Sequence, residues 1–122
     1  MTTTGKPITV STRGEALLWI ASRGSAAVLA LCVVVHLATM IVAVRGGLSA
    51  ADILARTRGS VAWALFYGVF VVAVAIHAPL GLRTVIAELA RGSGRLLDVT
   101  MALFALALLI GGMRAVVAVT LR

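Results

Sequence analysis

Acidic side chains are scarce in this sequence, and their scarcity is the first constraint on its function. The 122 residues include only four acids, Glu15, Asp52, Glu88 and Asp98, and none of them lies deep inside an apolar run. A catalytic mechanism based on paired carboxylates is therefore not expected. Charged residues of both signs make up 12% of the chain, whereas soluble domains carry about 25%.

The single cysteine and the placement of the basic residues exclude further classes of protein. Cys32 has no partner for an intrachain disulfide, and one thiol is too few to hold an iron–sulfur cluster. No dinucleotide-binding pattern is visible, so a flavin is not expected. The 11 Lys and Arg residues give a net charge of +7, but they flank apolar segments. Flanking cations are typical of membrane helices, so nucleic-acid binding is not expected.

Long apolar runs dominate what is present. Hydrophobic residues make up 61% of the sequence, and three runs are long enough to cross a bilayer as helices of about 20 residues or more. We predict an all-α integral membrane protein with a polar N-terminal segment at 1–15 and a three-helix transmembrane domain at 16–122. The predicted spans cover about 16–44, 61–89 and 96–121. The N-terminal segment is too long and too polar for a standard signal peptide.

The connections between the predicted spans are short. Gly46 and Gly47 break the first helix. Ser49 and Asp52 then form a capping pattern for a short interfacial helix over about 50–57. A turn rich in glycine and serine joins the second span to the third.

The basic residues set a slight preference for the orientation in the membrane. Six lie on the side of the N-terminus, namely Lys6, Arg13, Arg23, Arg83, Arg91 and Arg95. Five lie on the opposite side, namely Arg45, Arg56, Arg58, Arg114 and Arg122. The positive-inside rule therefore places the N-terminus in the cytoplasm.

Two histidines, His36 and His77, lie inside the first and second predicted spans. When a histidine inside a membrane has only a packing role, its imidazole bonds a serine, a threonine or a backbone carbonyl on a neighbouring helix. Two of them in a chain with few other deep polar groups favour a function. At about 1.5 Å per residue, His36 lies roughly 30 Å and His77 roughly 18 Å from the N-terminal side. A single haem iron is therefore not expected to bind both histidines. If each histidine instead binds the iron of its own haem, with the two haems stacked across the membrane, each iron needs a second ligand from elsewhere.

Small residues near the histidines leave room for a flat macrocycle. Ala73, His77 and Gly81 share a helix face, and Gly81 removes a side chain one turn after the histidine. On the first span, Ser25 shares a face with His36. Such residues also serve ordinary helix–helix packing in membranes, so both interpretations stay open.

Two arginines offer polar contacts on the N-terminal side. Arg83 follows His77 by six residues, and Arg23 lies near the start of the first span. A guanidinium at this depth suits a haem propionate or a quinone carbonyl; snorkelling to lipid phosphates is the alternative. Function is the preferred interpretation for Arg23, and for Arg83 both stay open.

The stretches WIASRGSAAVLALCVVVHL, residues 19–37, and HAPLGLRTVIAEL, residues 77–89, carry a family resemblance. Together they resemble the cytochrome b membrane-anchor subunits of succinate dehydrogenase and fumarate reductase. The second stretch has the more specific pattern, with His77, Gly81 and Arg83 in the family's spacing. In the first, Trp19 stands where the family has a serine, and Ser22 precedes the arginine.

The resemblance implies a set of site residues and cofactors. His77 and His36 would be axial ligands of haem b, of which there would be one or two, shared with a partner chain. The implied haem-site residues are His77, His36, Arg23, Arg83, Ser25 and Gly81. The implied quinone contacts are Arg23, Ser22 and Trp19.

The resemblance also implies partners and a location. A flavoprotein subunit and an iron–sulfur subunit would form the catalytic head, and electrons from succinate would reach a quinone near Arg23. A second membrane-anchor subunit, or a second copy of this chain, would complete the helical bundle and supply the missing haem ligands. The chain would lie in the bacterial inner membrane as a multi-pass protein.

Three other functions remain as alternatives. A haem-free anchor or assembly subunit would use its histidines in packing. A small multidrug-type transporter usually has four spans and a carboxylate in the first, which this chain lacks beyond Glu15. A haem b protein with a different dehydrogenase head would share the same histidine pattern.

Overall fold

The computed structural model describes residues 12–121, which are built from helices and short turns without a strand. In chain order the helices are α1 (Thr12–Arg45), α2 (Ala50–Thr57), α3 (Val61–Leu89) and α4 (Arg95–Thr120). The three longest are long and apolar enough to cross a membrane. The predicted all-α class with three spanning helices is therefore confirmed.

The helix bounds lie close to the predicted ones. α3 covers the predicted range 61–89, and α4 begins one residue before the predicted start. α1 begins at Thr12 rather than at residue 16, so the end of the expected polar segment is helical. Glu15 in the first turn of α1 favours this extension, because a carboxylate there faces the positive end of the helix dipole. The rest of that segment, residues 1–11, lies outside the described residues.

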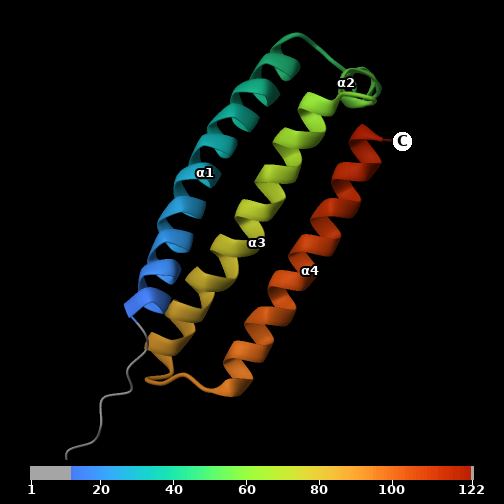
Figure 1. Ribbon diagram of the computed structural model, residues 1–122. Coiled ribbons are helices and arrows are strands. Elements are labelled where there is room, and N and C mark those ends of the chain that lie inside the picture. The colour runs from blue at the N-terminus through green and yellow to red at the C-terminus, as the bar shows by residue number, and fades with distance from the viewer. Residues whose placement is uncertain (1–11, 122) are drawn as a thin grey trace, which may run out of the picture.

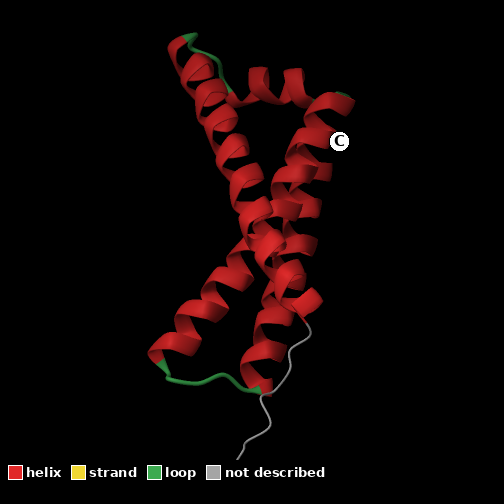
Figure 2. Ribbon diagram, turned by 60° about the vertical axis from the view of Figure 1, so that its left-hand side comes forward, coloured by secondary structure: helices red, strands yellow, loops and turns green. Residues whose placement is uncertain are grey.

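The three long helices form a single layer. α3 lies between α1 and α4 and packs against both (Figure 1). Seen from the side, α1 crosses α3 and α4 obliquely instead of running parallel to them (Figure 2). Each helix therefore keeps much of its surface away from the other two.

The surface of this layer is apolar. Leu31, Leu65 and Leu106, one on each long helix, are 67%, 65% and 51% exposed. No more than 11% of the most apolar 18-residue window of any long helix is buried. Contact with lipid or with another membrane subunit removes this surface from water, which is the arrangement expected of a chain that spans a bilayer.

The closest approach of α3 and α4 occurs at a glycine. A Cβ atom built on Gly112 would lie 2.5 Å from Cγ1 of Val71, whereas one built on Gly111 would meet nothing within 4 Å. Gly112 therefore permits the contact, as small residues commonly do between membrane helices.

A glycine in the left-handed conformation ends α1. Gly47 has φ +68°, and its amide donates to the carbonyl of Val44 at 3.1 Å. The amide of Leu48 donates to Ala43 at 3.1 Å. These two bonds form a Schellman motif, which satisfies carbonyls that the end of a helix leaves free. The helix break predicted from the glycine pair is confirmed.

The short helix α2 is capped as the sequence predicts. The Oδ2 atom of Asp52 accepts hydrogen bonds from the Ser49 amide at 2.8 Å and from the Ser49 hydroxyl at 2.7 Å. The Asp52 amide donates back to the Ser49 hydroxyl at 3.2 Å. These bonds, led by the one from the hydroxyl, hold the pKa of the Asp52 carboxyl below its ordinary value.

Polar groups next to α2 also close the end of α4. The Thr57 hydroxyl donates to the carbonyl of Val119 at 2.8 Å, and the Gly59 amide donates to the carbonyl of Thr120 at 2.6 Å. The last carbonyls of a helix have no partner within the helix itself. Their satisfaction by Thr57, the last residue of α2, and by Gly59, just after it, fixes that short helix across the end of the layer.

We predict that Gly112→Ala weakens the packing of α3 against α4. The added Cβ would overlap Val71, and overpacking of this kind costs about 1–3 kcal/mol. The thermal unfolding midpoint of the chain in detergent should therefore fall, and Val71→Ala in the same chain should restore it. Gly111→Ala is the matched control and should leave the midpoint unchanged. Equal midpoints for the two alanine variants would contradict the contact.

We predict that Asp52→Ala loosens α2. The change removes the acceptor that holds the amide and hydroxyl of Ser49, the N-cap residue, so amide exchange within residues 50–57 should become faster, by up to about fivefold. Exchange within α3 should not change. Because the pKa of Asp52 is lowered in the folded chain, its contribution is complete at neutral pH and is lost as the pH falls through that lowered pKa. Unchanged exchange in α2 would show that Thr57 and Gly59 hold it alone.

Candidate functional site

Two imidazole nitrogens stand out from the other buried polar atoms. Within residues 12–121, Nδ1 of His36 and Nδ1 of His77 are the buried side-chain nitrogen or oxygen atoms that have no hydrogen-bond partner. The hydroxyls of the spans instead donate to carbonyls of their own helices, as Thr39 does to His36 and Thr120 does to Val116. An unpaired polar atom in hydrocarbon is costly, so these two nitrogens set the histidines apart from the other buried polar groups of residues 12–121.

His36 on α1 lies against the aromatic side chains of α3. Its ring meets Tyr67 and Phe70 edge to face, with ring centroids 5.9 Å apart in each pair. Sequence reasoning assigned Tyr67 no part in the site, because aromatic residues near span ends commonly anchor a helix at the interface. The structure shows that Tyr67 is instead a wall beside the imidazole.

His36 also borders an apolar cavity of about 430 Å³. Residues of α2 form its roof, with Ile53, Leu54 and Thr57 in the lining. The absence of a side chain at Gly112 helps to define the opposite wall, on α4. A cavity with apolar walls and one unsatisfied polar group is the usual form of a small-molecule site.

His77 has a different environment. It lies half-buried on α3, and Gly81, one turn later, has open space where a Cβ would project. His77 follows Phe70, which contacts His36, by seven residues. This spacing corresponds to roughly 10 Å along the helix axis. The two imidazoles therefore lie at different levels in the layer, in agreement with the separation expected from the sequence.

Neither histidine forms a complete metal site within the described part of the chain. Residues 12–121 contain no group of three or more His, Cys, Asp or Glu side chains that could hold a metal ion. A six-coordinate haem iron, in contrast, needs only two axial ligands from protein. A single histidine can supply one of these two ligands.

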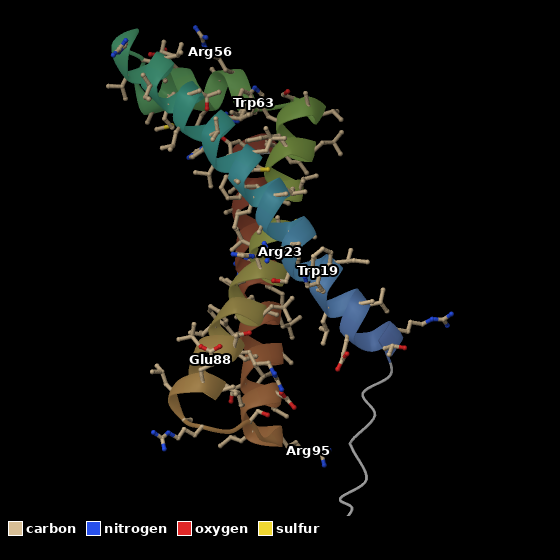
Figure 3. All side chains as sticks on the ribbon, turned by 90° about the vertical axis from the view of Figure 1, so that its left-hand side faces the viewer. Trp19, Arg23, Arg56, Trp63, Glu88 and Arg95 are labelled. Atoms are coloured by element: carbon tan, nitrogen blue, oxygen red, sulfur yellow. The ribbon has the colours of Figure 1, made fainter. Side chains whose placement is uncertain are left out.

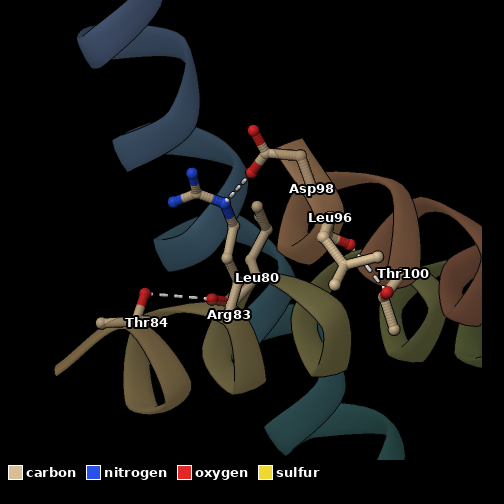
Figure 4. Close-up of polar contacts among 6 residues, drawn as sticks. All are labelled: Leu80, Arg83, Thr84, Leu96, Asp98 and Thr100. Atoms are coloured by element: carbon tan, nitrogen blue, oxygen red, sulfur yellow. Dashed lines mark hydrogen bonds and ion pairs between the residues drawn. The ribbon is translucent and has the colours of Figure 1, made fainter. Parts of the chain in front are cut away.

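Arg83 has an ionic partner that the sequence analysis missed. Its Nε atom donates to Oδ1 of Asp98 at 2.7 Å, which joins α3 to α4 near the turn between them (Figure 4). The two side chains are 39% and 55% exposed. The sequence contained the signal for this pair, because Arg83 lies near the end of the second predicted span and Asp98 near the start of the third. Two antiparallel helices joined by a short turn bring such positions together. The terminal nitrogens of Arg83 remain available for a further acceptor.

The predicted quinone contacts lie together on α1. The guanidinium carbon of Arg23 is 5.9 Å from the centre of the Trp19 ring, at cation–π distance (Figure 3). The carbonyl of Ser22 accepts a hydrogen bond from the buried Ser25 hydroxyl at 3.1 Å. Arg23 has no ion pair with any carboxylate of residues 12–121. The guanidinium is therefore free to bind an acceptor from outside the chain.

The structure does not join all of the candidate residues into one site. No hydrogen bond, ion pair or ring contact within residues 12–121 connects Trp19, Ser22, Arg23 or Ser25 with His77, Gly81 or Arg83. His36 belongs to a third group, beneath α2. The candidate residues thus form three separate groups in the layer.

These features define a class of protein. A layer of three spanning helices with half-buried imidazoles inside the spans is typical of a membrane protein whose intramembrane polar groups have a function. A family model described as the succinate dehydrogenase/fumarate reductase transmembrane subunit matches residues 8–112. The chain belongs to this family. The match extends the resemblance seen in the sequence through most of α4.

Two further comparisons gave no relatives. Neither the curated proteins nor the solved structures yielded a match to this chain.

Proposed function

We propose that this chain is a haem b-bearing membrane anchor of a succinate:quinone oxidoreductase. It passes electrons between an iron–sulfur subunit and membrane quinone, and a flavoprotein subunit completes the catalytic head. The family supports membership of a succinate or fumarate oxidoreductase complex. The observation that carries the finer proposal is the pair of half-buried imidazoles on two levels of the membrane domain, each with a buried Nδ1 atom that has no hydrogen-bond partner among the described residues.

The donor chemistry of these residues fits haem b. A neutral imidazole binds iron through one ring nitrogen, and its other nitrogen commonly donates to a carbonyl or a carboxylate. Neither Nδ1 has such an acceptor in the described chain. A partner subunit that supplies both the second axial ligand and this acceptor satisfies each histidine. Haem b, when bound there, accepts and releases single electrons.

The form of the layer agrees with a shared site. The helices leave apolar surface exposed on α1, α3 and α4, and Gly81 leaves open space one turn after His77. A macrocycle beside His77 therefore needs a second wall. A second anchor subunit, or a second copy of this chain, provides that wall in our proposal.

The quinone head group is proposed to bind at the start of α1. Arg23 offers a guanidinium without an ionic partner among the described residues, and the Trp19 ring lies beside it. A planar donor next to an aromatic face suits a quinone ring with a carbonyl at its edge. Ser22 precedes Arg23 and is half-buried, so its hydroxyl is a further donor on this part of α1.

Arg83 remains part of the proposed haem site, but its ion pair with Asp98 changes the role that we propose for it. Its bond to Asp98 neutralises part of its charge and fixes the direction of its side chain. Its two terminal nitrogens bind a haem propionate in the proposal. The carboxylate of Asp98 weakens the attraction for a second anion, so Arg83 orients the group more than it adds affinity.

We predict that each histidine holds a separate haem in the assembled complex. The reduced-minus-oxidised absorbance spectrum, with haem counted per copy of this chain, should show two haems in the parent complex. His36→Ala and His77→Ala should each lose a different one.

Other spectra would point to the alternatives. A single haem that disappears only with His77→Ala would make His36 a packing residue. No haem in the intact complex would sink the proposal and favour a haem-free anchor.

We predict that Arg23→Gln weakens quinone binding. Loss of one hydrogen bond from a charged donor costs about 1.5–3 kcal/mol, so the KM for quinone should rise about tenfold or more. Succinate-driven reduction of a soluble dye by the head subunits should not change. Arg13→Gln, also on α1 but outside the Trp19 contact, is the control and should leave the KM unchanged. An unaltered KM in the Arg23 variant would place the quinone elsewhere.

A further inference from the structure

A second apolar groove lies beneath α2, beside the cavity that His36 borders. It has a volume of about 310 Å³ and lies between the last turns of α1, the helix α2 and the first turns of α3. Met40 and Ala43 line it from α1, Ile53 from α2, and Trp63 and Tyr67 from α3. The one charged residue of its lining is Arg56.

Arg56 forms no ion pair within the described part of the chain. Its guanidinium has no carboxylate within 4.0 Å among residues 12–121. The carboxylate of Asp52, one turn earlier on α2, attracts Arg56 from a longer distance, but its Oδ2 atom is bound to the amide and hydroxyl of Ser49. Arg45 and Arg58 add two further positive charges near this end of the layer. The mouth of the groove therefore has an excess of positive charge.

The groove lies at the boundary of the membrane. α1 ends at Arg45 and α3 begins at Val61, so α2 crosses the layer at the depth where the spans stop. Figure 3 shows Arg56 and Trp63 at this same end of the molecule, with the Arg56 side chain directed away from the bundle. Tryptophan favours this depth, because its ring is apolar and its indole N–H is a donor.

The other arginines that border a hollow do not combine these features. Arg114 lies in a shallow depression that α4 alone forms. Arg83 borders a groove between α3 and α4, but Asp98 of the same groove pairs with it. Arg56 is thus the unpaired cation at the head of an apolar groove between helices.

We propose that this groove is a binding site for an anionic phospholipid. The phosphate binds the Arg56 guanidinium, the indole N–H of Trp63 is a second donor to the head group, and part of an acyl chain lies along Met40, Ala43 and Tyr67. Arginine is suited to phosphate because its donors form a planar fork. The positive surroundings favour an anionic head group over a zwitterionic one.

The proposal is tested by lipid binding to the full chain purified in detergent. The probes are dioleoyl phosphatidylglycerol and, as the zwitterionic match, dioleoyl phosphatidylcholine, with bound lipid counted by native mass spectrometry. We expect one phosphatidylglycerol per chain at concentrations where phosphatidylcholine does not bind. Arg56→Gln should weaken this binding about fivefold, the effect typical of one cation near a membrane surface. Arg114→Gln is the control, because Arg114 borders a depression that α4 alone forms and does not line the groove, and it should bind as the parent chain does.

A second variant tests the groove itself. Ala38 lines the groove and is exposed, so Ala38→Phe fills the space without disturbing a packed core. It should abolish phosphatidylglycerol binding while Arg56 remains. Equal binding by Arg56→Gln and the parent chain, equal binding of both lipids, or full binding by the Ala38 variant would each overturn the proposal. Competition by soluble glycerol phosphate at equal concentration would also overturn it, because the acyl chain would then contribute nothing. None of these measurements depends on haem or quinone.

Discussion

The fold depends on the satisfaction of hydrogen bonds where no water is present. In hydrocarbon every backbone group needs a partner within the protein, which is why the spans are helices. Several hydroxyls of the spans are paired in the same way: Ser25, Thr84 and Thr100 donate to carbonyls of their own helices. Even the free carbonyls at the end of α4 are met, by Thr57 and Gly59. Against this background the two bare imidazole nitrogens are exceptions, and exceptions of this kind in a membrane mark function.

The single layer explains why the proposed function requires another chain. A helix with neighbours on two sides still exposes its remaining surface, and here that surface is apolar on all three spans. α1 and α4 lie on opposite sides of α3, so residues 12–121 are not arranged as a four-helix bundle around a central core (Figure 1). The histidines are half-buried rather than enclosed. In the proposed function, the open surfaces on which a second subunit packs are therefore also the ones on which a shared cofactor fits.

Local signals in the sequence predicted local structure well. The ranges of the spans follow from apolar runs whose length the bilayer sets, and the cap of α2 follows from Ser49 and Asp52 alone. The pair formed by Arg83 and Asp98 was missed because it depends on how two helices meet. The turn after α3 shows a further limit: Arg91 takes the left-handed conformation, φ 53°, although Gly92 follows it. Composition identified that turn but not which residue adopts the unusual conformation.

The two histidines differ in how much of their surroundings this chain supplies. They therefore differ in how much they depend on a partner subunit. His36 already has aromatic walls from Tyr67 and Phe70 and a roof from α2, so this chain supplies most of its pocket. His77 borders none of the cavities described above, and Gly81 beside it is open. A group bound at His77 must therefore be enclosed largely by the neighbouring subunit. Assembly and cofactor retention are expected to be most tightly coupled at His77, whose motif is also the more specific part of the family resemblance.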